Sequence, residues 1–237
     1  MTRELVYGRN AVREALRGRR EVLELWITER AAARADWAAG SGPRPQVRKE
    51  RELSEAAGTA DHQGVVAWAA PYPYADAWEL AAGGLPLLAC LDQVTDPRNL
   101  GAVVRSAAGA GASGVILPAH GAARVTPAVC RASAGAVEHL PVAVVPNLSR
   151  YLGEIKRADL WALAAVADAP EGMWQADLSG GLALVFGAEG RGVRPLVRRT
   201  CDAAVAIPLA AGAESLNVSV AAAVLLYEAR RQRAVAA

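Results

Sequence analysis

The chain has 237 residues, of which 53% are hydrophobic and 21% are charged, and its formal net charge at pH 7 is +2. This length favours two domains of ordinary size. No apolar run approaches the roughly 18 residues of a membrane-spanning helix. The first residues also lack the apolar core of a signal peptide. We therefore expect a cytoplasmic protein without a membrane partner.

The first 70 residues predict a small α/β unit. Apolar residues recur at helical spacing between Gly8 and Arg17, and residues 23–27 alternate in polarity as in a strand. We therefore expect the chain to begin with a helix followed by a strand. The other expected elements are a helix over 30–39, a short strand near Val47, a helix over 50–57 and a strand over 65–68.

Residues 71–86 are rich in Pro and Gly and lack sustained periodicity, which predicts a linker between two domains. Apolar segments without alternation follow it, and helical segments separate most of them. This pattern is typical of a parallel sheet covered on both faces, so residues 87–237 are predicted to form a doubly wound α/β domain. The expected strands are 87–91, 114–117, 142–145, 161–164, 182–186 and 204–207.

The loops after these strands are where a ligand is expected, because doubly wound sheets bind ligands beyond the carboxyl ends of their strands. The loop after the first strand leads to Asn99, a candidate helix cap, and to Arg105 two turns later. The sequence of this loop alone fits an ordinary strand–turn–helix junction and a phosphate-binding site equally well. Arg105 favours the phosphate site, because the other residues of its helix are mostly small.

Two further loops carry candidate site residues. Gly187–Gly192 has three glycines around Glu189, but their spacing fits neither the dinucleotide fingerprint nor the P-loop, so neither NAD nor ATP is implied. The last loop runs from Ile207 to Asn217 and enters the C-terminal helix. Ser215 or Asn217 could cap that helix, but a cap requires only one of them. The three cysteines lack metal-ligand spacing, and no metal site is predicted.

Taken in order, these loops resemble the three motifs of the SpoU (TrmH) family of RNA ribose 2′-O-methyltransferases. The matching segments are Asp96–Gly101 with Arg105, Gly187–Gly192, and Ile207-Pro208 followed by Ser215–Ser219. Tyr7–Val12 and His62–Val65 are similar to the small, ribosomal-protein-like substrate domain of the RlmB-like branch. The resemblance implies S-adenosylmethionine (AdoMet) as methyl donor, a deep trefoil knot and a homodimer.

The resemblance also implies roles for individual residues. Gly187, Ile207 and Leu216, with Leu209 close by, match positions that hold the cofactor. The residues that match the reacting end are Asn99, Arg105, Glu189, Ser215 and Asn217. A guanidinium with a pKa above about 12 is a poor proton acceptor at neutral pH. We therefore expect Arg105 to stay charged, to bind a target phosphate and to stabilise the developing alkoxide.

The substrate-domain resemblance favours a guanosine of 23S rRNA as the target. The alternatives are a methyltransferase that acts on tRNA, a resistance-type rRNA methyltransferase, and a non-catalytic RNA-binding protein of ribosome assembly. RNA binding by the N-terminal domain is predicted for Arg13, Arg17, Arg19 and Arg20. The competing interpretation is that these charges only solvate a helix face.

Overall fold

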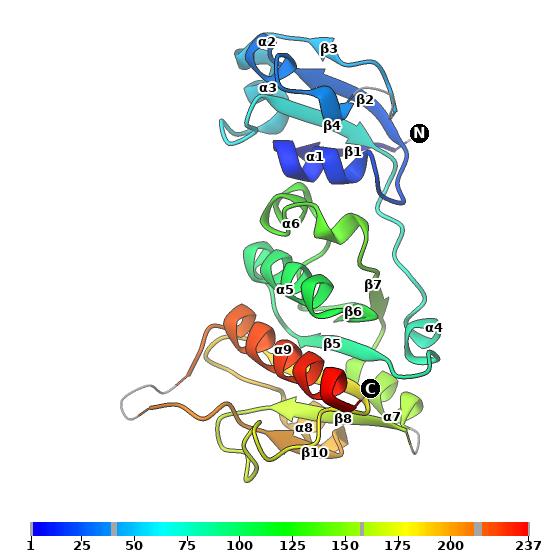
Figure 1. Ribbon diagram of the computed structural model, residues 1–237, viewed down its shortest axis with the longest axis vertical. Helices are drawn as coiled ribbons and strands as arrows, with labels where there is room; N and C mark the ends of the chain where they lie inside the picture. The colour runs from blue at the N-terminus through cyan, green and yellow to red at the C-terminus, as the bar shows by residue number, and fades with distance from the viewer. Residues whose placement is uncertain (1, 39–41, 157–158, 211–214, 237) are drawn as a thin grey trace. The chain divides into compact units, whose positions relative to one another are not determined.

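The computed structural model describes residues 2–38, 42–156, 159–210 and 215–236, and its chain divides into two compact units (Figure 1). The first unit is Met1–Pro73 with Arg124–His139, and the second is Tyr74–Ala123 with Leu140–Ala237. The segment 124–139, which lies far along the chain, thus packs with the N-terminal residues. No helix among the described residues has the length and apolarity needed to cross a bilayer.

A four-stranded sheet forms the centre of the first unit. Its order is β1 (Glu4–Tyr7), β4 (Val65–Ala69), β2 (Val22–Ile27) and β3 (Gln46–Val47). A strand therefore precedes the predicted first helix, and the prediction that the helix is the first element was wrong. β1 has four residues, of which Val6 alone is buried. Its extended conformation depends on antiparallel pairing with β4, some sixty residues away, which no local pattern reveals.

The helices of the first unit are short. α1 (Arg9–Ala15) and α3 (Glu50–Ala57) lie where they were predicted. The predicted helix over 30–39 is instead α2 (Glu29–Ala32) followed by a 3₁₀ turn at Asp36–Ala38. Thr28 caps α2, but α2 buries no residue, so tertiary packing does not extend it beyond one turn. α6 (Pro127–Ala132) also belongs to this unit.

The second unit is built on a six-stranded parallel sheet, and all six predicted strands are confirmed. Its order is β10 (Ala203–Val205), β8 (Leu160–Ala165), β9 (Gly181–Gly187), β5 (Leu87–Asp92), β6 (Gly114–Pro118) and β7 (Val142–Val145). β5 and β9 are central, and every residue of β5 is buried. The strand order reverses between them, which is where doubly wound sheets open a binding crevice.

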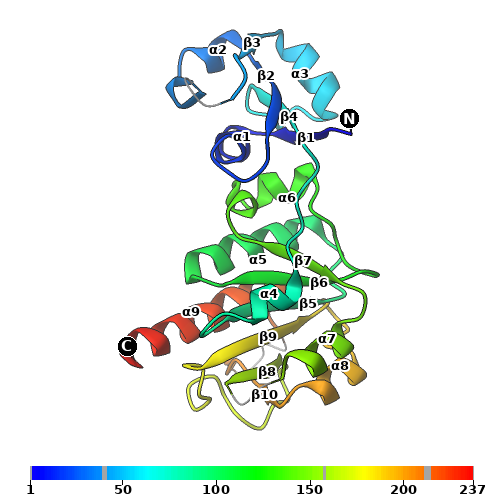
Figure 2. The ribbon, with the colours of Figure 1, turned by 90° about the vertical axis from the view of Figure 1, so that its right-hand side faces the viewer.

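Helices cover both faces of this sheet (Figure 2). α5 (Pro97–Ala110) and α9 (Val218–Ala236) pack together on one face. α4 (Ala77–Ala81), α7 (Leu148–Ile155) and α8 (Pro195–Thr200) share a core with the other.

The predicted linker 71–86 thus contains a helix, because Asp76 caps α4 and the alanines at 77 and 81 are buried. The domain boundaries drawn at this linker stay a prediction, and so does the trefoil knot.

Candidate functional site

A pocket of about 840 Å³ lies at the carboxyl ends of β8, β9 and β10. The four residues predicted to hold a cofactor all line it, and so do Glu189, Ser215 and Asn217. Its walls are residues 165–168, 186–193, 205, 207 and 209 with Arg198, together with 215–218 and Ala221 where the chain enters α9. Three separate loop segments therefore meet around one cavity.

The shape of the loop after β9 depends on glycine. A Cβ placed on Gly187 would fall on the backbone of Gly192 and Val193, so no other residue fits there without displacing the loop. The Gly192 N–H donates to the Ala188 carbonyl at 2.8 Å, and Gly192 has φ 64°. The loop thus folds back on itself and presents backbone groups and the Glu189 side chain to the pocket.

Asp92 anchors the far end of the same loop. It is the last residue of β5 and is fully buried. Its carboxylate accepts the backbone N–H of Arg194 at 2.8 Å and the Nε of Arg194 at 2.8 Å. The sequence motifs do not single out Asp92 as a site residue, although a carboxylate that ends a fully apolar strand is a usable signal.

Three polar side chains from three separate segments of the chain form a cluster at the edge of the pocket. Asn99 Nδ2 donates to Glu189 Oε1 at 3.0 Å, and Asn217 Nδ2 donates to Asn99 Oδ1 at 3.1 Å and also to Glu189 Oε1. The Asn217 Oδ1 accepts the N–H of Ser219 at 2.9 Å, in the first turn of α9. Asn217 therefore accepts a backbone N–H at the start of α9 through its oxygen and bonds to the cluster through its nitrogen.

Asn99 does not cap α5, contrary to the prediction. The cap is Asp96, whose carboxylate accepts the N–H of Arg98 at 2.8 Å, with Pro97 as the first helical residue. Because Asn99 lies within the first turn, its side chain is free to reach Glu189. Glu189 is exposed and takes part in no ion pair among the described residues.

Arg105 lies elsewhere on α5. It is exposed, and its guanidinium makes no hydrogen bond or ion pair within the part of the chain that the structure describes. Six residues separate it from Asn99, which corresponds to about 9 Å along the axis and a different side of the helix. The structure thus brings Asn99, Glu189 and Asn217 together but does not join Arg105 to them.

A charged pair, Asp168 and Arg198, also lines the pocket. Arg198 Nη1 lies 3.0 Å from Asp168 Oδ2, and the hydrogen bond from Arg198 lowers the pKa of the Asp168 carboxyl. Neither residue belongs to the sequence motifs. Asp168 follows β8, however, so the strand-end criterion that marks the other loops also applies to it. Among the described residues, no group of three or more His, Cys, Asp or Glu could hold a metal ion.

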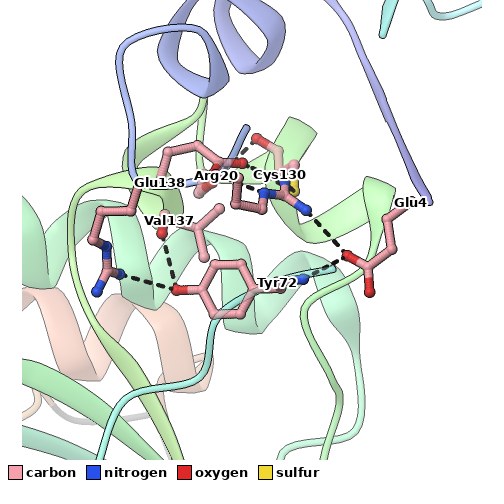
Figure 3. A network of polar contacts seen from close by, with 8 residues as sticks. Glu4, Arg20, Tyr72, Cys130, Val137 and Glu138 are labelled. Carbon is pink, nitrogen blue, oxygen red and sulfur yellow. Dashed lines mark hydrogen bonds and ion pairs between the residues drawn. The ribbon is translucent and has the colours of Figure 1, made fainter. Parts of the chain in front are cut away.

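The four arginines predicted to bind RNA have unequal surroundings. Arg13 Nε lies 2.7 Å from Glu14, Arg17 lies 3.7 Å from the same carboxylate, and Arg19 donates to the Tyr72 hydroxyl at 3.5 Å. Arg20 is different, because its side chain is 1% exposed and lies within the network of polar contacts of Figure 3. It is therefore not accessible to a phosphate, and the prediction that Arg20 contacts RNA does not fit this structure.

Arg20 instead holds together elements of the first unit. Its Nε donates to Glu138 Oε2 at 3.0 Å, and its Nη1 donates to Glu4 Oε2 at 3.0 Å. The backbone N–H of Tyr72 donates to the same Glu4 oxygen at 3.1 Å, as Figure 3 shows. Burial raises the pKa of the neighbouring Cys130 thiol to about 12, so this thiol stays protonated.

The chain matches two family models. Residues 86–227 match the SpoU rRNA Methylase family, and residues 5–75 match the model described as RNA 2′-O ribose methyltransferase substrate binding. An uncharacterized tRNA/rRNA methyltransferase of Synechocystis sp. is 40% identical over 97% of this chain, which spans 63% of that relative. The 23S rRNA (guanosine-2′-O-)-methyltransferase RlmB of Pseudomonas putida is 39% identical over 98% of both chains.

Solved structures resemble the whole chain as well. The SpoU methyltransferase AviRb from Streptomyces viridochromogenes, in complex with the cofactor AdoMet, has a TM-score of 0.82 and 28% sequence identity. The match covers 97% of this chain and 90% of AviRb.

Proposed function

The chain belongs to the SpoU family of AdoMet-dependent RNA 2′-O-methyltransferases, and from this we infer that its substrate is a guanosine ribose of 23S rRNA. The observation that carries this proposal is the cluster of Asn99, Glu189 and Asn217 beside the pocket of the glycine loop. A protein that only bound RNA would not need three polar side chains joined next to a cofactor-sized cavity. The guanosine is supported by the RlmB relative, which aligns with the chain over nearly its full length.

The pocket suits AdoMet in its chemistry. Ile207, Leu209 and Leu216 offer apolar contacts to the adenine ring, and the backbone of the Gly187 loop offers amides and carbonyls that recognise a neutral base. The Arg198 guanidinium suits the carboxylate of the methionine moiety. Bound AdoMet supplies a methyl group on a positively charged sulfur.

The polar cluster has the task of holding the ribose. Methyl transfer to a hydroxyl requires the oxygen near 3 Å from the methyl carbon and in line with the bond that breaks. We propose that Asn99 and Glu189 orient the target nucleotide, while Ser215 and Asn217 support the site next to the methyl group. Because the hydroxyl loses its proton, a positive charge nearby stabilises the alkoxide that develops.

We assign this positive charge to Arg105, with an oxygen of the target phosphate as the proton acceptor. Arg105 makes no hydrogen bond or ion pair in the described part of the chain, so its guanidinium is free to bind RNA. Its position on α5 suits a site that is completed by a second copy of the chain. Half-exposed apolar side chains on α9, the helix packed against α5, support a homodimer: Val220 is 47% and Tyr227 49% exposed. We place this dimer in the cytoplasm, where rRNA is made and modified.

The proposed function is tested by incubating the protein with labelled AdoMet and unmodified 23S rRNA or tRNA. Alkali cleaves RNA through the free 2′-hydroxyl, so a methylated ribose leaves one resistant linkage that can be mapped. We expect a single resistant guanosine linkage in 23S rRNA. Label in tRNA alone would favour the tRNA alternative. Absence of transfer, together with no heat of AdoMet binding in calorimetry, would leave only the non-catalytic RNA-binding protein.

A further inference from the structure

The first unit contains a second pocket, of about 430 Å³, which we call the Trp37 pocket. This volume lies within the range of about 300–1,000 Å³ that is usual for small-ligand sites. Residues of both N-terminal motifs line it, namely Arg9 and Asn10 of the first and Gln63, Gly64 and Val65 of the second, along with Thr28, Arg30, Ala31, Arg34, Trp37 and Glu50. The methyl-transfer site uses neither motif.

A buried histidine shapes one wall of the Trp37 pocket. His62 is 0% exposed, and its Nδ1 accepts the N–H of Gly64 at 3.0 Å, so Nδ1 carries no proton. Its Nε2 therefore donates to the hydroxyl of Ser54 at 2.9 Å, which in turn donates to the Glu50 carbonyl at 3.1 Å. These bonds hold the turn at Gln63 and Gly64 with left-handed φ values of 55° and 74°.

The turn also requires a glycine and positions a neighbouring motif. A Cβ on Gly64 would lie 2.6 Å from the Thr28 Oγ1, so the turn packs directly on the start of α2. Gln63 Oε1 accepts the backbone N–H of Arg9 at 3.1 Å, which leaves the Nε2 of Gln63 as a donor. The wall is thus held in place by hydrogen bonds within the protein.

The charges of the Trp37 pocket are unbalanced. Arg9, Arg30 and Arg34 are exposed, and none of them is in an ion pair among the described residues. Arg9 Nη2 donates to the backbone carbonyl of Arg34 at 3.1 Å, which keeps the two residues together. Glu50 is the one acidic residue in the lining. Three guanidinium groups against one carboxylate leave a net positive charge, and guanidinium groups bind a phosphate through forked hydrogen bonds.

The fourth feature is an unsatisfied donor. The indole N–H of Trp37 is shielded from solvent and has no hydrogen-bond acceptor in the described part of the chain. A buried donor without an acceptor is unfavourable, and natural structures rarely keep one without a reason. Indole rings in RNA-binding proteins commonly pack against bases, which also carry hydrogen-bond acceptors.

We propose that the Trp37 pocket binds one unpaired nucleotide of the RNA substrate. Arg9, Arg30 and Arg34 hold its phosphate, the Trp37 ring contacts the base, and the amides of Asn10 and Gln63 contact the polar base edge. This inference rests on the proposed function in that the ligand belongs to the RNA that is methylated. It assigns RNA contact to arginines other than Arg13, Arg17 and Arg19.

The test compares the full-length protein with two variants, the double substitution Arg30→Ala/Arg34→Ala and the single substitution Trp37→Phe. Binding is measured on an unmethylated 23S rRNA transcript over a range of salt concentrations, independently of methyl transfer. We expect the double variant to weaken binding at least 10-fold and to reduce the salt slope by about 0.7–0.9 for each phosphate that it no longer neutralises. Trp37→Phe replaces the indole by a smaller ring, and the lost contact with the base is expected to weaken binding with the salt slope unchanged.

Arg51→Ala is the matched control, because Arg51 lies in the same unit, is 88% exposed and is outside the Trp37 pocket. Its RNA affinity should stay within 2-fold of the parent protein. If the double variant and Trp37→Phe also stay within 2-fold while the parent protein methylates RNA, the pocket assignment is overturned and the proposed function survives. If the parent protein transfers no methyl group to any RNA, the proposed function fails, and the binding data still report on the pocket.

Discussion

Replacement of Arg20 by alanine should destabilise the first unit without weakening RNA binding. Arg20 and Glu138 are each 1% exposed at their side chains and form two hydrogen bonds, of 3.0 and 2.5 Å. Arg20→Ala leaves the Glu138 carboxylate buried with no cation among the described residues, where its remaining hydrogen-bond partner is the Cys130 thiol at 3.8 Å. Removal of one partner of a buried ion pair typically costs about 3–5 kcal/mol.

That cost is a large part of the roughly 5–15 kcal/mol by which a domain is stable. The free energy of unfolding is measured in urea by tryptophan fluorescence, to which Trp26, Trp37 and Trp68 contribute from the first unit and the other three tryptophans from the second. Arg13→Ala is the control, because the Arg13 pair is partly solvated and such pairs contribute at most about 1 kcal/mol. The double variant Arg20→Met/Glu138→Leu should recover most of the stability, since it removes both charges.

A phosphate-binding role of Arg20 would give a different result. If Arg20→Ala changed the unfolding free energy by less than about 1 kcal/mol and reduced the salt slope of RNA binding by about 1, Arg20 would be a phosphate ligand after all.

Three further predictions concern the second unit. Arg105→Lys should keep more methyl-transfer activity than Arg105→Ala at neutral pH, because a lysine ammonium group also stabilises an alkoxide. If the rate of the Arg105→Lys variant instead rises with pH as the new amine loses its proton, residue 105 acts as the base. Asp92→Ala should raise the Kd for AdoMet by about 10- to 100-fold, because the glycine loop loses its hydrogen bonds to a charged group. An unchanged Kd in calorimetry would show that the loop keeps its shape without these hydrogen bonds. Hydrogen bonds from Arg231 and Gln232 lower the pKa of Glu228 from 4.5 to about 2. The ionised carboxylate therefore stabilises the fold above pH 4.5, and this contribution disappears as the pH falls toward 2, so Glu228→Gln should be less stable than the parent at pH 7 and equal to it near pH 2. An equal stability difference at both pH values would contradict this reasoning.

The sequence by itself determined the second unit to a large extent. Its six strands are predicted from apolar runs, because a sheet covered on both faces buries nearly every residue of its central strands β5 and β9. The strand-end rule then led to Gly187, Glu189 and Asn217, which the structure brings to one cavity and its edge. The local sequence pattern and the position in the fold agree here because each strand is marked by an apolar run of its own.

Only the tertiary structure decided the features that depend on distant partners. β1 is a strand because it pairs with β4, and Asn99 belongs to the polar cluster because Asp96 takes the cap. In the sequence, Arg20 does not differ from the neighbouring surface arginines. In the structure it is buried against Glu138, which lies 118 positions later in the chain. Burial of a charge is a property of the folded chain as a whole, since it requires an opposite charge in place before water is excluded. No local period in the sequence encodes that pairing.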